Sequence, residues 1–489
     1  MKPLPVPFVL LLLLFNPIFL LAQSTQKARV MVLTDIEADP DDAQSLVRFL
    51  AYANEFDVEG LIATTSTHQR NRIAPETIHT ILNAYGKVQP NLLKHARGYP
   101  TALELKTRVK KGLARYGMDG VGEGHDSEGS EWIIKALEKP DSRPLWLSVW
   151  GGPNCLAQAL WKIQKTRSPQ QAAPLYKKLR VYTISDQDDS GPWIRKTFPE
   201  VFFIVSPGSY RNATWLGITR NFPGANNDVI SNEWITRNIQ QEHGPLGLEY
   251  PDVAYGMEGD TPSFLGLIPN GLNDPEHPEY GGWGGRYERY TPVAEPSSDA
   301  PVTVRTQGGQ LVTMPVSGTE TRPIWTNAED TFSPLMAARW GGPYVVDTAR
   351  YKSSQVTLWR WREDFQHDFA ARMDWMVSDY KNANHPPVPK LAHPAVLQVK
   401  SGQIFGLNAE GSYDPDGDAL RYYWFQYPEA GTFKEPVPFA PFSPNLANLH
   451  TIKAPEVTRP QTIHFILKVT DKGSPALTRY KRVIVQVMP

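Results

Sequence analysis

Cysteine is nearly absent from this sequence. Cys155 is the one cysteine among 489 residues, which excludes both an intramolecular disulfide and a zinc site built from cysteine thiolates. The formal net charge of −1 provides no basic field for nucleic acid. The fold must therefore be stabilised by apolar packing, and we expect no nucleic-acid partner.

Long apolar runs are also scarce, and the one present lies at the amino terminus. Lys2 precedes the apolar stretch 8–21 (FVLLLLLFNPIFLL), and Ala22 offers a cleavage edge. An uncleaved membrane anchor is the alternative, but Pro17 and the shortness of the run argue against it. We expect residues 1–22 to be a signal peptide, which predicts a secreted or periplasmic protein with no membrane span in the mature chain.

Short apolar runs alternate with helical spacings over residues 28–206. Apolar runs typical of buried parallel strands occur at 28–35, 56–67, 144–152, 179–185 and 201–206. Apolar residues at helical spacing occur at 42–56, 74–88, 129–139 and 155–166. This alternation predicts an α/β domain over 28–380, an open and mostly parallel sheet flanked by helices.

The pattern changes twice beyond residue 206. Residues 207–345 are rich in Gly, Pro, Asn and Trp, and we interpret them as long insertions over the carboxyl ends of the strands. After a further helical pattern, the Pro-rich stretch 381–394 reads as a linker. The strand-like runs over 395–489 predict a small all-β, immunoglobulin-like sandwich.

Five carboxylates occupy eight positions between the first strand and the first helix, namely Asp35, Glu37, Asp39, Asp41 and Asp42. A helix dipole stabilises each such charge by only about 0.3–1 kcal/mol, whereas Ca²⁺ accepts about six to eight oxygen ligands. A capped helix start with solvated acids is the alternative, and it accounts for one or two of the five. The count and the position favour a site for a hard divalent cation.

The segment TDIEADPDDA (34–43) resembles the amino-terminal signature of the inosine–uridine-preferring nucleoside hydrolases, Asp-x-Asp-x-Gly-x-Asp-Asp after a first strand. The chain is most similar to a nucleoside-hydrolase-like family that carries a carboxy-terminal domain named after a cellulose-binding protein. Segments that support this resemblance lie at 119–137, 149–160, 184–207 and 258–265. The resemblance covers nearly the whole mature chain.

This resemblance implies a Ca²⁺ ion that binds two sugar hydroxyls and a water. It assigns as metal ligands Asp35, Glu37, Asp42, the backbone carbonyl of Asn154, and Asp260. It assigns Asp41 as the catalytic base that activates the metal-bound water. Gly259 stands where the related hydrolases have a His that protonates the leaving base, so the resemblance leaves the leaving-group acid open.

Further polar residues follow other strands and are candidates for substrate binding. His68 follows the second strand, and Asp186, Asp188 and Asp189 follow the strand at 179–185. Glu258 precedes the late aspartate, and the leaving-group acid is to be sought among Asp188, Asp189 and Glu258, which the sequence does not rank. A polar strand-to-helix loop at 186–193 and a rim or packing role for His68 are the alternatives.

The sandwich contains a second acidic run, with Asp414, Asp416 and Asp418 in alternation. A second calcium site is one interpretation, and an Asx-rich turn that needs no ion is the other. We favour the turn.

Two classes of function follow from these observations. The first is a secreted, Ca²⁺-dependent hydrolase of an N- or O-glycosidic bond in a furanoside- or nucleoside-like substrate, including a polysaccharide-derived glycan. The alternative is a non-catalytic carbohydrate-binding protein on a hydrolase scaffold, which binds a cellulose-like polysaccharide through its carboxy-terminal domain. The change at Gly259 favours the second and the intact Asp41–Asp42 pair favours the first. The oligomeric state, a homo-oligomer included, is left open.

Overall fold

The computed structural model describes residues 26–207, 210–292, 303–305, 311–313, 320–336, 345–438 and 449–489. The predicted signal peptide lies outside these residues. None of the helices within them has the length and apolarity needed to cross a membrane.

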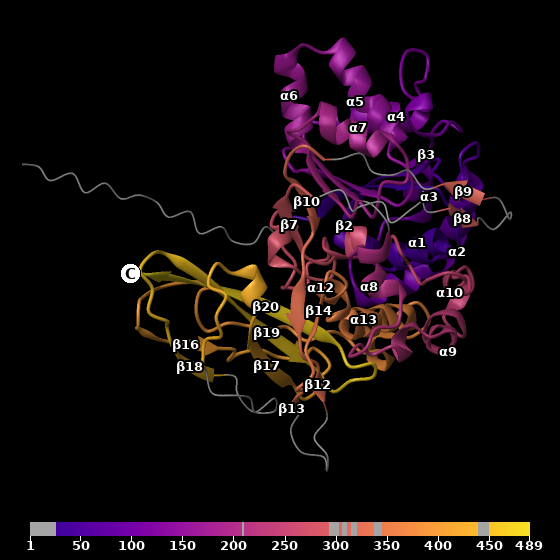
Figure 1. The fold of residues 1–489 in the computed structure, drawn as a ribbon. Coiled ribbons are helices and arrows are strands. Elements are labelled where there is room, and N and C mark those ends of the chain that lie inside the picture. The colour runs from indigo at the N-terminus through magenta and orange to yellow at the C-terminus, as the bar shows by residue number, and fades with distance from the viewer. Residues whose placement is uncertain are drawn as a thin grey trace, which may run out of the picture.

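The large domain is built on an eight-stranded sheet in which only β7 runs antiparallel to its neighbour (Figure 1). In spatial order the strands are β3 (Val109–Lys111), β2 (Phe56–Ala63), β1 (Ala28–Thr34), β4 (Leu145–Val149), β5 (Leu179–Thr183), β6 (Phe202–Val205), β10 (Ile324–Asn327) and β7 (Tyr287–Tyr290). The open, mostly parallel sheet expected from the sequence is confirmed.

The central strand β1 contributes to both cores of this domain. Its side chains alternate, so Val30 and Val32 join one buried cluster while Met31 and Leu33 join the other. A strand covered on both faces reads as a continuous apolar run, which is why the sequence identified it.

Helices cover both faces of the sheet (Figure 1). One face packs against α1 (Asp41–Ala51), α2 (Pro75–His95), α13 (Arg362–Asp374) and the short helices α10 (Gly244–Leu248) and α11 (Pro262–Leu265). The other face packs against α4 (Glu128–Glu138), α5 (Asn154–Thr166), α6 (Pro169–Lys178) and α7 (Ser190–Thr197). The remaining short helices are α3 (Ala102–Thr107), α8 (Leu216–Thr219), α9 (Asn232–Ile235) and α12 (Val356–Trp359).

Local sequence explains where several of these helices begin. Pro75 occupies the first turn of α2, where its missing N–H leaves no hydrogen bond unmade. Ser127 accepts from the backbone of Ser130 and closes a capping box at the start of α4. Helix α1 begins directly at Asp41 and Asp42, so two carboxylates lie at its positive end.

The stretch 207–345 contributes more than insertions, because it also supplies β10 and β7 of the main sheet. The prediction of insertions alone is wrong for these segments. In β7 only Tyr287 is buried and the next three residues are exposed, so the edge strand has no apolar pattern for sequence reasoning to detect. The same stretch and its continuation form three small two-stranded sheets, β8 (Thr303–Arg305) with β9 (Leu311–Thr313), β11 (Asp330–Phe332) with β14 (Tyr351–Ser353), and β12 (Leu335–Met336) with β13 (Val345–Val346).

The carboxy-terminal sheets form a sandwich with its own core, as the sequence predicts. One sheet has the order β15 (Val396–Lys400), β20 (Thr478–Met488), β19 (Gln461–Thr470) and β17 (Arg421–Gln426), and the other pairs β16 (Ile404–Asn408) with β18 (Leu449–Lys453). Phe465 and Val485 point into this core, while Ile466 and Tyr480 point the other way and join the core of the large domain. The sandwich is therefore packed against the large domain rather than tethered beside it (Figure 1).

Buried ion pairs reinforce this junction at helix α13. Lys468 donates to Asp364 at 2.7 Å, and Arg479 donates to Asp368 at 2.5 Å. Asp368 also accepts from the hydroxyl of Tyr52, the residue that follows α1, at 2.7 Å. Helix α13 thus connects the sandwich to α1, the helix that begins at the acidic cluster.

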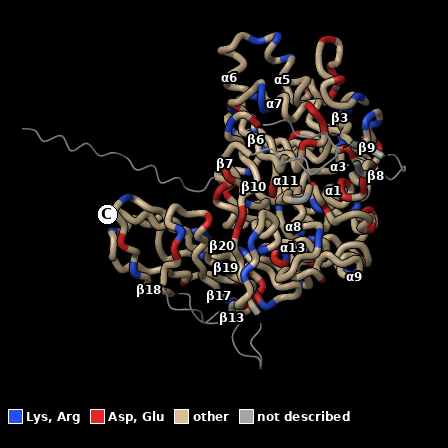
Figure 2. The backbone as a smooth tube through the Cα atoms, viewed as in Figure 1, with Lys and Arg blue, Asp and Glu red and all other residues tan. Residues whose placement is uncertain are grey.

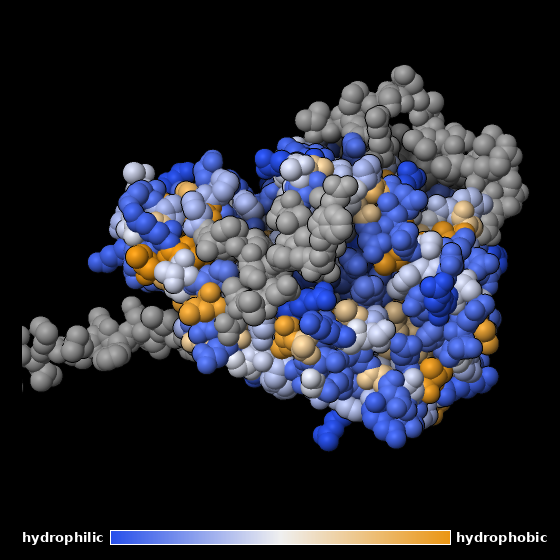
Figure 3. Space-filling view, turned by 90° about the horizontal axis from the view of Figure 1, so that it is seen from below, coloured by the Kyte–Doolittle hydropathy of each residue, from blue (hydrophilic) through white to orange (hydrophobic). Residues whose placement is uncertain are grey.

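The surface agrees with the balanced charge of the sequence. Lys and Arg alternate with Asp and Glu along the tube of both domains (Figure 2). The face seen in Figure 3 is mostly hydrophilic, with hydrophobic residues in small separate groups. Neither view presents a broad surface of one character.

Candidate metal and sugar site

A cavity of about 310 Å³ lies where the carboxyl ends of β1 and β5 meet the segments 210–220 and 255–260. Its lining consists of Asp35, Ala38, Asp39, Pro40, Asp41, Asp42, His68, Ile184, Gln187, Tyr210, Trp215, Leu216, Thr219, Arg220, Tyr255, Gly256 and Asp260. The carboxyl edge of an open α/β sheet is the usual place for a ligand. The cavity is large enough for a small molecule and is strongly acidic on one side.

Three carboxylates converge in this cavity. One oxygen each from Asp41, Asp42 and Asp260 lie within 4.8 Å of one another. Asp41 and Asp42 come from the first turn of α1, and Asp260 comes from the turn that precedes α11. A hard cation prefers such an all-oxygen set, so this triad can hold a metal ion.

Two further carboxylates, Asp35 and Asp39, follow β1 and line the same cavity as the triad. The hydroxyl of Thr34 donates to Asp42, which fixes one of its oxygens. The side chain of Asp35 packs against Gly151 so closely that a Cβ there would lie 2.6 Å from its Oδ1. The second carboxylate, Asp39, lines the cavity from the same turn.

Burial and mutual repulsion raise the pKa values of these acids. Burial, followed by the charges of Asp39 and Asp35, raises the pKa of Asp41 to about 7. Burial and the neighbouring carboxylates raise the pKa values of Asp42 and Asp260 well above the ordinary range. Within the described part of the chain, no Lys or Arg forms an ion pair with any of the three.

One observation in particular indicates that these carboxylates suit a divalent cation. Oδ2 of Asp260 is buried and has no hydrogen-bond partner among the residues that the structure describes. A buried carboxylate oxygen without a partner is strongly destabilising unless a ligand satisfies it. Asp41, Asp42 and Asp260 are the residues placed to hold an ion, and Asp35 lines the same cavity.

Glu37 does not belong to this cluster, which corrects the ligand set predicted from sequence. Its backbone is left-handed, with φ at 78°, and its carboxylate binds the side chains of Arg72 and Thr77 at the surface. With this backbone, the side chain points to Arg72 and Thr77, and Glu37 is absent from the cavity lining.

Glu258 is a structural anchor rather than a substrate ligand or acid. It is fully buried and forms an ion pair with Arg48, and its carboxylate accepts from Nη2 of Arg48 at 3.0 Å, from Tyr250 at 2.7 Å and from Thr261 at 2.8 Å. The pair with Arg48 ties the 258–261 turn to α1, which brings Asp260 beside Asp41. Both oxygens are already bonded, so the predicted contact with substrate is wrong.

The three aspartates after β5 also lie outside the cavity lining. Asp186 forms a two-pronged ion pair with Arg195, with distances of 2.7 and 2.8 Å. Asp189 is exposed and accepts from the backbone of Met118. Asp188 is fully buried and accepts from Ser190, and burial raises its pKa to about 7. The neighbouring Gln187 is the residue that reaches the cavity.

Of the two remaining predicted residues, His68 lines the cavity and Asn154 does not. His68 lines the cavity, and its Nε2 lies 3.3 Å from the hydroxyl of Tyr210. Asn154 opens helix α5 outside the lining, and its side chain bonds to Thr65, to Arg115 and to the backbone of Cys155. The structure thus brings together Asp35, Asp41, Asp42, His68 and Asp260 of the predicted set.

Sequence reasoning missed part of the wall formed by the irregular stretch after β6. Tyr210, Thr219, Arg220 and Tyr255 line the cavity, and Trp215 packs edge-on against Tyr210. No motif marks these residues. The richness of 207–345 in aromatic and turn residues was the one available signal, and it points to a region rather than to a residue.

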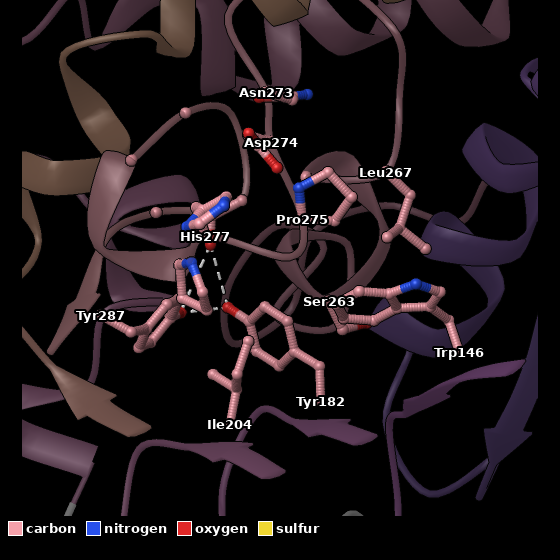
Figure 4. Close-up of a pocket in the computed structure, with 16 residues that line it drawn as sticks. Trp146, Tyr182, Ile204, Ser263, Leu267, Asn273, Asp274, Pro275, His277 and Tyr287 are labelled. Atoms are coloured by element: carbon pink, nitrogen blue, oxygen red, sulfur yellow. Dashed lines mark hydrogen bonds between the residues drawn. The ribbon is translucent and has the colours of Figure 1, made fainter. Parts of the chain in front are cut away.

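A second hollow of about 40 Å³ is lined by residues of β4, β5 and β6 and by residues between 263 and 287 (Figure 4). Trp146, Tyr182 and Ile204 rise from the strands toward the loop that contains Asn273 and His277. The Tyr182 hydroxyl donates to the carbonyl of Gly284 at 3.0 Å. This hollow has room for roughly one or a few waters and no converging acids, so it is not the candidate site.

Comparison with known proteins gives matches over both parts of the chain. Residues 29–287 match the family model described as the cellulose-binding Sde182, nucleoside hydrolase-like domain. Residues 404–487 match the model of the cellulose-binding protein Sde0182, C-terminal domain. No curated protein matches the chain at the level of sequence.

Among solved structures, a nucleoside hydrolase-related hypothetical protein from Saccharophagus degradans, said to be associated with carbohydrate metabolism, is 35% identical with a TM-score of 0.75. The match covers 95% of this chain and 100% of that one. The effector protein XOO4466 is 11% identical with a TM-score of 0.28, over 61% of this chain and 90% of that one. The type III effector XopQ, complexed with adenosine diphosphate ribose, is 11% identical with a TM-score of 0.26, over 51% and 69%. The two effector similarities are too low to carry an argument.

Proposed function

We propose a function from the premise that this chain belongs to the family of the cellulose-binding Sde182, nucleoside hydrolase-like domain. On that premise the protein is a metal-dependent hydrolase of a glycosidic bond in a glycan, with Ca²⁺ as the cation. An exported location, secreted or periplasmic, is part of the proposal and rests on the amino-terminal sequence.

The observation that carries this proposal is the cluster of Asp41, Asp42 and Asp260 around an unsatisfied buried oxygen. A family fold alone does not imply catalysis, because function depends on the site. Three converging acids with raised pKa values at the edge of a sheet support a site for a cation and a hydroxyl-bearing ligand.

In this proposal the cation and the residues that line the cavity have separate roles. When bound, the cation supplies the positive charge that the carboxylates lack, holds sugar hydroxyls and acidifies a water. Asp41, at the start of α1, takes a proton from the attacking water as the general base. The rings of Tyr210 and Trp215 offer a wall on which a sugar stacks. The buried Nε1 of Trp215 has no hydrogen-bond partner within the described part of the chain and can donate to a hydroxyl.

A second candidate function is binding without catalysis. Gly259, beside Asp41, supplies no group to protonate a leaving group. A protein that keeps the cation site and loses turnover would hold a glycan in the same cavity, with a cellulose-like polysaccharide on the sandwich. The description of the carboxy-terminal family supports that second contact.

The test is a hydrolysis screen of the full chain on furanosides, pyranosides, nucleosides and cello-oligosaccharides, with and without chelator. We expect turnover of a glycoside that chelator abolishes and Ca²⁺ restores. Asp41→Asn should reduce kcat by about 10²–10⁴-fold, the usual contribution of a general base, while substrate still binds. Asp416→Asn, in the sandwich, is the matched control and should turn over normally.

The outcomes separate the two candidates. Turnover that survives both chelator and Asp41→Asn would contradict the mechanism. Calcium-dependent glycan binding with no turnover across the screen would replace the hydrolase by the binding protein.

A further inference from the structure

The cavity wall beside Asp41 contains no side chain at position 259. A Cβ added at Gly259 would lie 2.8 Å from Oδ2 of Asp41 and 3.3 Å from two carbons of the Trp215 ring. The indole therefore occupies the space that any side chain here would need. A proton donor for the leaving group has to come from another part of the wall.

Side-chain contacts lead along the wall from Trp215 to the imidazole of His68. The rings of Trp215 and Tyr210 meet edge to face at a centroid distance of 5.0 Å. The hydroxyl of Tyr210 lies 3.3 Å from Nε2 of His68, and both residues line the cavity. Trp215 and Tyr210 therefore form a stretch of wall that connects the surroundings of Asp41 to His68, and all four residues line the same cavity.

The surroundings suit a proton donor at His68. Asp35 and Asp39 line the same cavity as His68, so the imidazole shares its cavity with acidic side chains. Burial raises the pKa of Tyr210, which keeps its hydroxyl protonated and able to orient the imidazole. The backbone N–H of His68 bonds to the hydroxyl of Ser66 at 2.9 Å, which holds the loop.

We infer that His68 is the catalytic acid of this site and that Tyr210 is its positioning residue, an inference that rests on the proposed function. Water attacks the anomeric carbon as Asp41 removes one of its protons. The bond between that carbon and the glycosidic oxygen breaks with its electron pair on the oxygen, and the imidazolium of His68 gives that oxygen the proton of Nδ1 while Nε2 stays hydrogen-bonded to the Tyr210 hydroxyl. Asp41 ends protonated and His68 neutral, and exchange with solvent restores both.

The donor's identity is tested by how each variant depends on the leaving group. The best glycone found in the hydrolysis screen is offered as its 4-nitrophenyl glycoside, whose leaving group needs no acid, and as its methyl glycoside, whose leaving group does. We expect His68→Gln to lower kcat on the methyl glycoside by about 10²-fold or more, with little change in KM, and to leave the 4-nitrophenyl glycoside within about threefold of the unaltered protein. Tyr210→Phe should show the same selectivity with a smaller loss.

Matched variants and controls make the result decisive. His79→Gln, on α2 outside the cavity, should behave as the unaltered protein on both substrates. Equal losses on both glycosides for His68→Gln and Tyr210→Phe would overturn this inference while leaving the hydrolase intact. A selective loss in Asp39→Asn instead would assign the acid to Asp39 and also overturn it. Absence of turnover in the unaltered protein on every substrate would overturn the proposed function itself.

Discussion

Two aspartate-rich segments of this protein look alike in sequence and differ in where their oxygens point. In the sandwich, Oδ1 of Asp414 accepts from the backbone of Asp416 at 2.8 Å and of Asp418 at 3.2 Å, as in an Asx turn. Asp416 in turn pairs with His385 at 3.0 Å. Beyond the end of β1, Asp41 and Asp42 instead face Asp260, and none of these three acids forms an ion pair with a Lys or Arg of the described residues.

The difference shows that acidic spacing alone does not define a metal site. The sandwich loop lies at an exposed strand connection, where its own N–H groups reach the first carboxylate. The β1 cluster lies where a strand end, a helix start and a distant turn converge, so its acids face one another instead. Glu258 shows the same difference from a residue close to it in the sequence. It is two positions from Asp260, yet both of its carboxylate oxygens are bonded.

The largest expected effect is on the free energy of unfolding, and it comes from replacing Glu258. Glu258→Gln removes the charge that compensates Arg48 in a fully buried pair, and we expect the free energy of unfolding to fall by about 3–5 kcal/mol. Denaturant unfolding measures it. Glu233→Gln breaks an exposed pair with Arg237 and should change the same quantity by less than about 0.5 kcal/mol. Equal effects would show that Glu258 is not the anchor described above.

Substitutions in the two acidic segments should differ in their effect on the affinity for Ca²⁺. Asp260→Asn and Asp42→Asn each remove a buried ligand, so we expect calorimetric titration with Ca²⁺ to give an affinity lower by at least about 100-fold, at the upper end of the loss from an outer-shell partner. Asp414→Asn should leave the affinity unchanged. If Asp414→Asn were the variant that lost binding, the assignment of the two segments would be reversed.

The stability of the metal-free protein should depend on pH because of the β1 cluster. The folded-state pKa of Asp41 is raised from 3.8 to about 7, so the folded chain binds more protons than the unfolded chain between these values. This contribution to stability is present below about pH 3.8 and is lost as the pH rises through about 7. In chelator, Tm should therefore fall by several degrees across this window.

Two controls complete the pH experiment. Saturating Ca²⁺ binds only the folded chain, so it should restore Tm at pH 7. Asp41→Asn should flatten the decline in chelator. A Tm in chelator that rises steadily from pH 4 to pH 7 would contradict the picture of uncompensated carboxylates.

The smallest effect is expected in the sandwich loop. Asp416→Asn weakens a partly exposed pair with His385, so the free energy of unfolding should fall by only about 1 kcal/mol. Denaturant unfolding with and without Ca²⁺ should give the same difference. A loss that depends on Ca²⁺ would show that this loop holds an ion after all.

Much of the fold was predictable because buried parallel strands and helix starts can each be identified from a short stretch of sequence. The apolar run at β1, the acids at the start of α1 and the Pro at the start of α2 each encode a single element. Edge strand β7 was not predictable, because three of its four residues are exposed and the apolar pattern is missing. The side of the sandwich that packs on α13 was also hidden, since its sequence reads as a free sheet.

The candidate site was predictable only in part. Asp35, Asp41, Asp42, His68 and Asp260 were identified from motifs and strand ends, and all five line one cavity. Glu37, Asp186 and Glu258 have the same chemistry, and their partners Arg72, Arg195 and Arg48 decide their roles from 35, 9 and 210 positions away along the chain. Such partners cannot be identified from spacing along one segment.

The sequence by itself determined the α/β order of the large domain, the β-rich end of the chain and the concentration of carboxylates after the first strand. Those properties are local, because they follow from periodicity and from residues adjacent in the chain. Only the tertiary structure decided which carboxylates remain unpaired, and that His68 and Tyr210 share one wall with Asp41. The physical reason is that the charge state and partner of a buried group depend on everything packed around it, and those neighbours come from segments hundreds of residues apart.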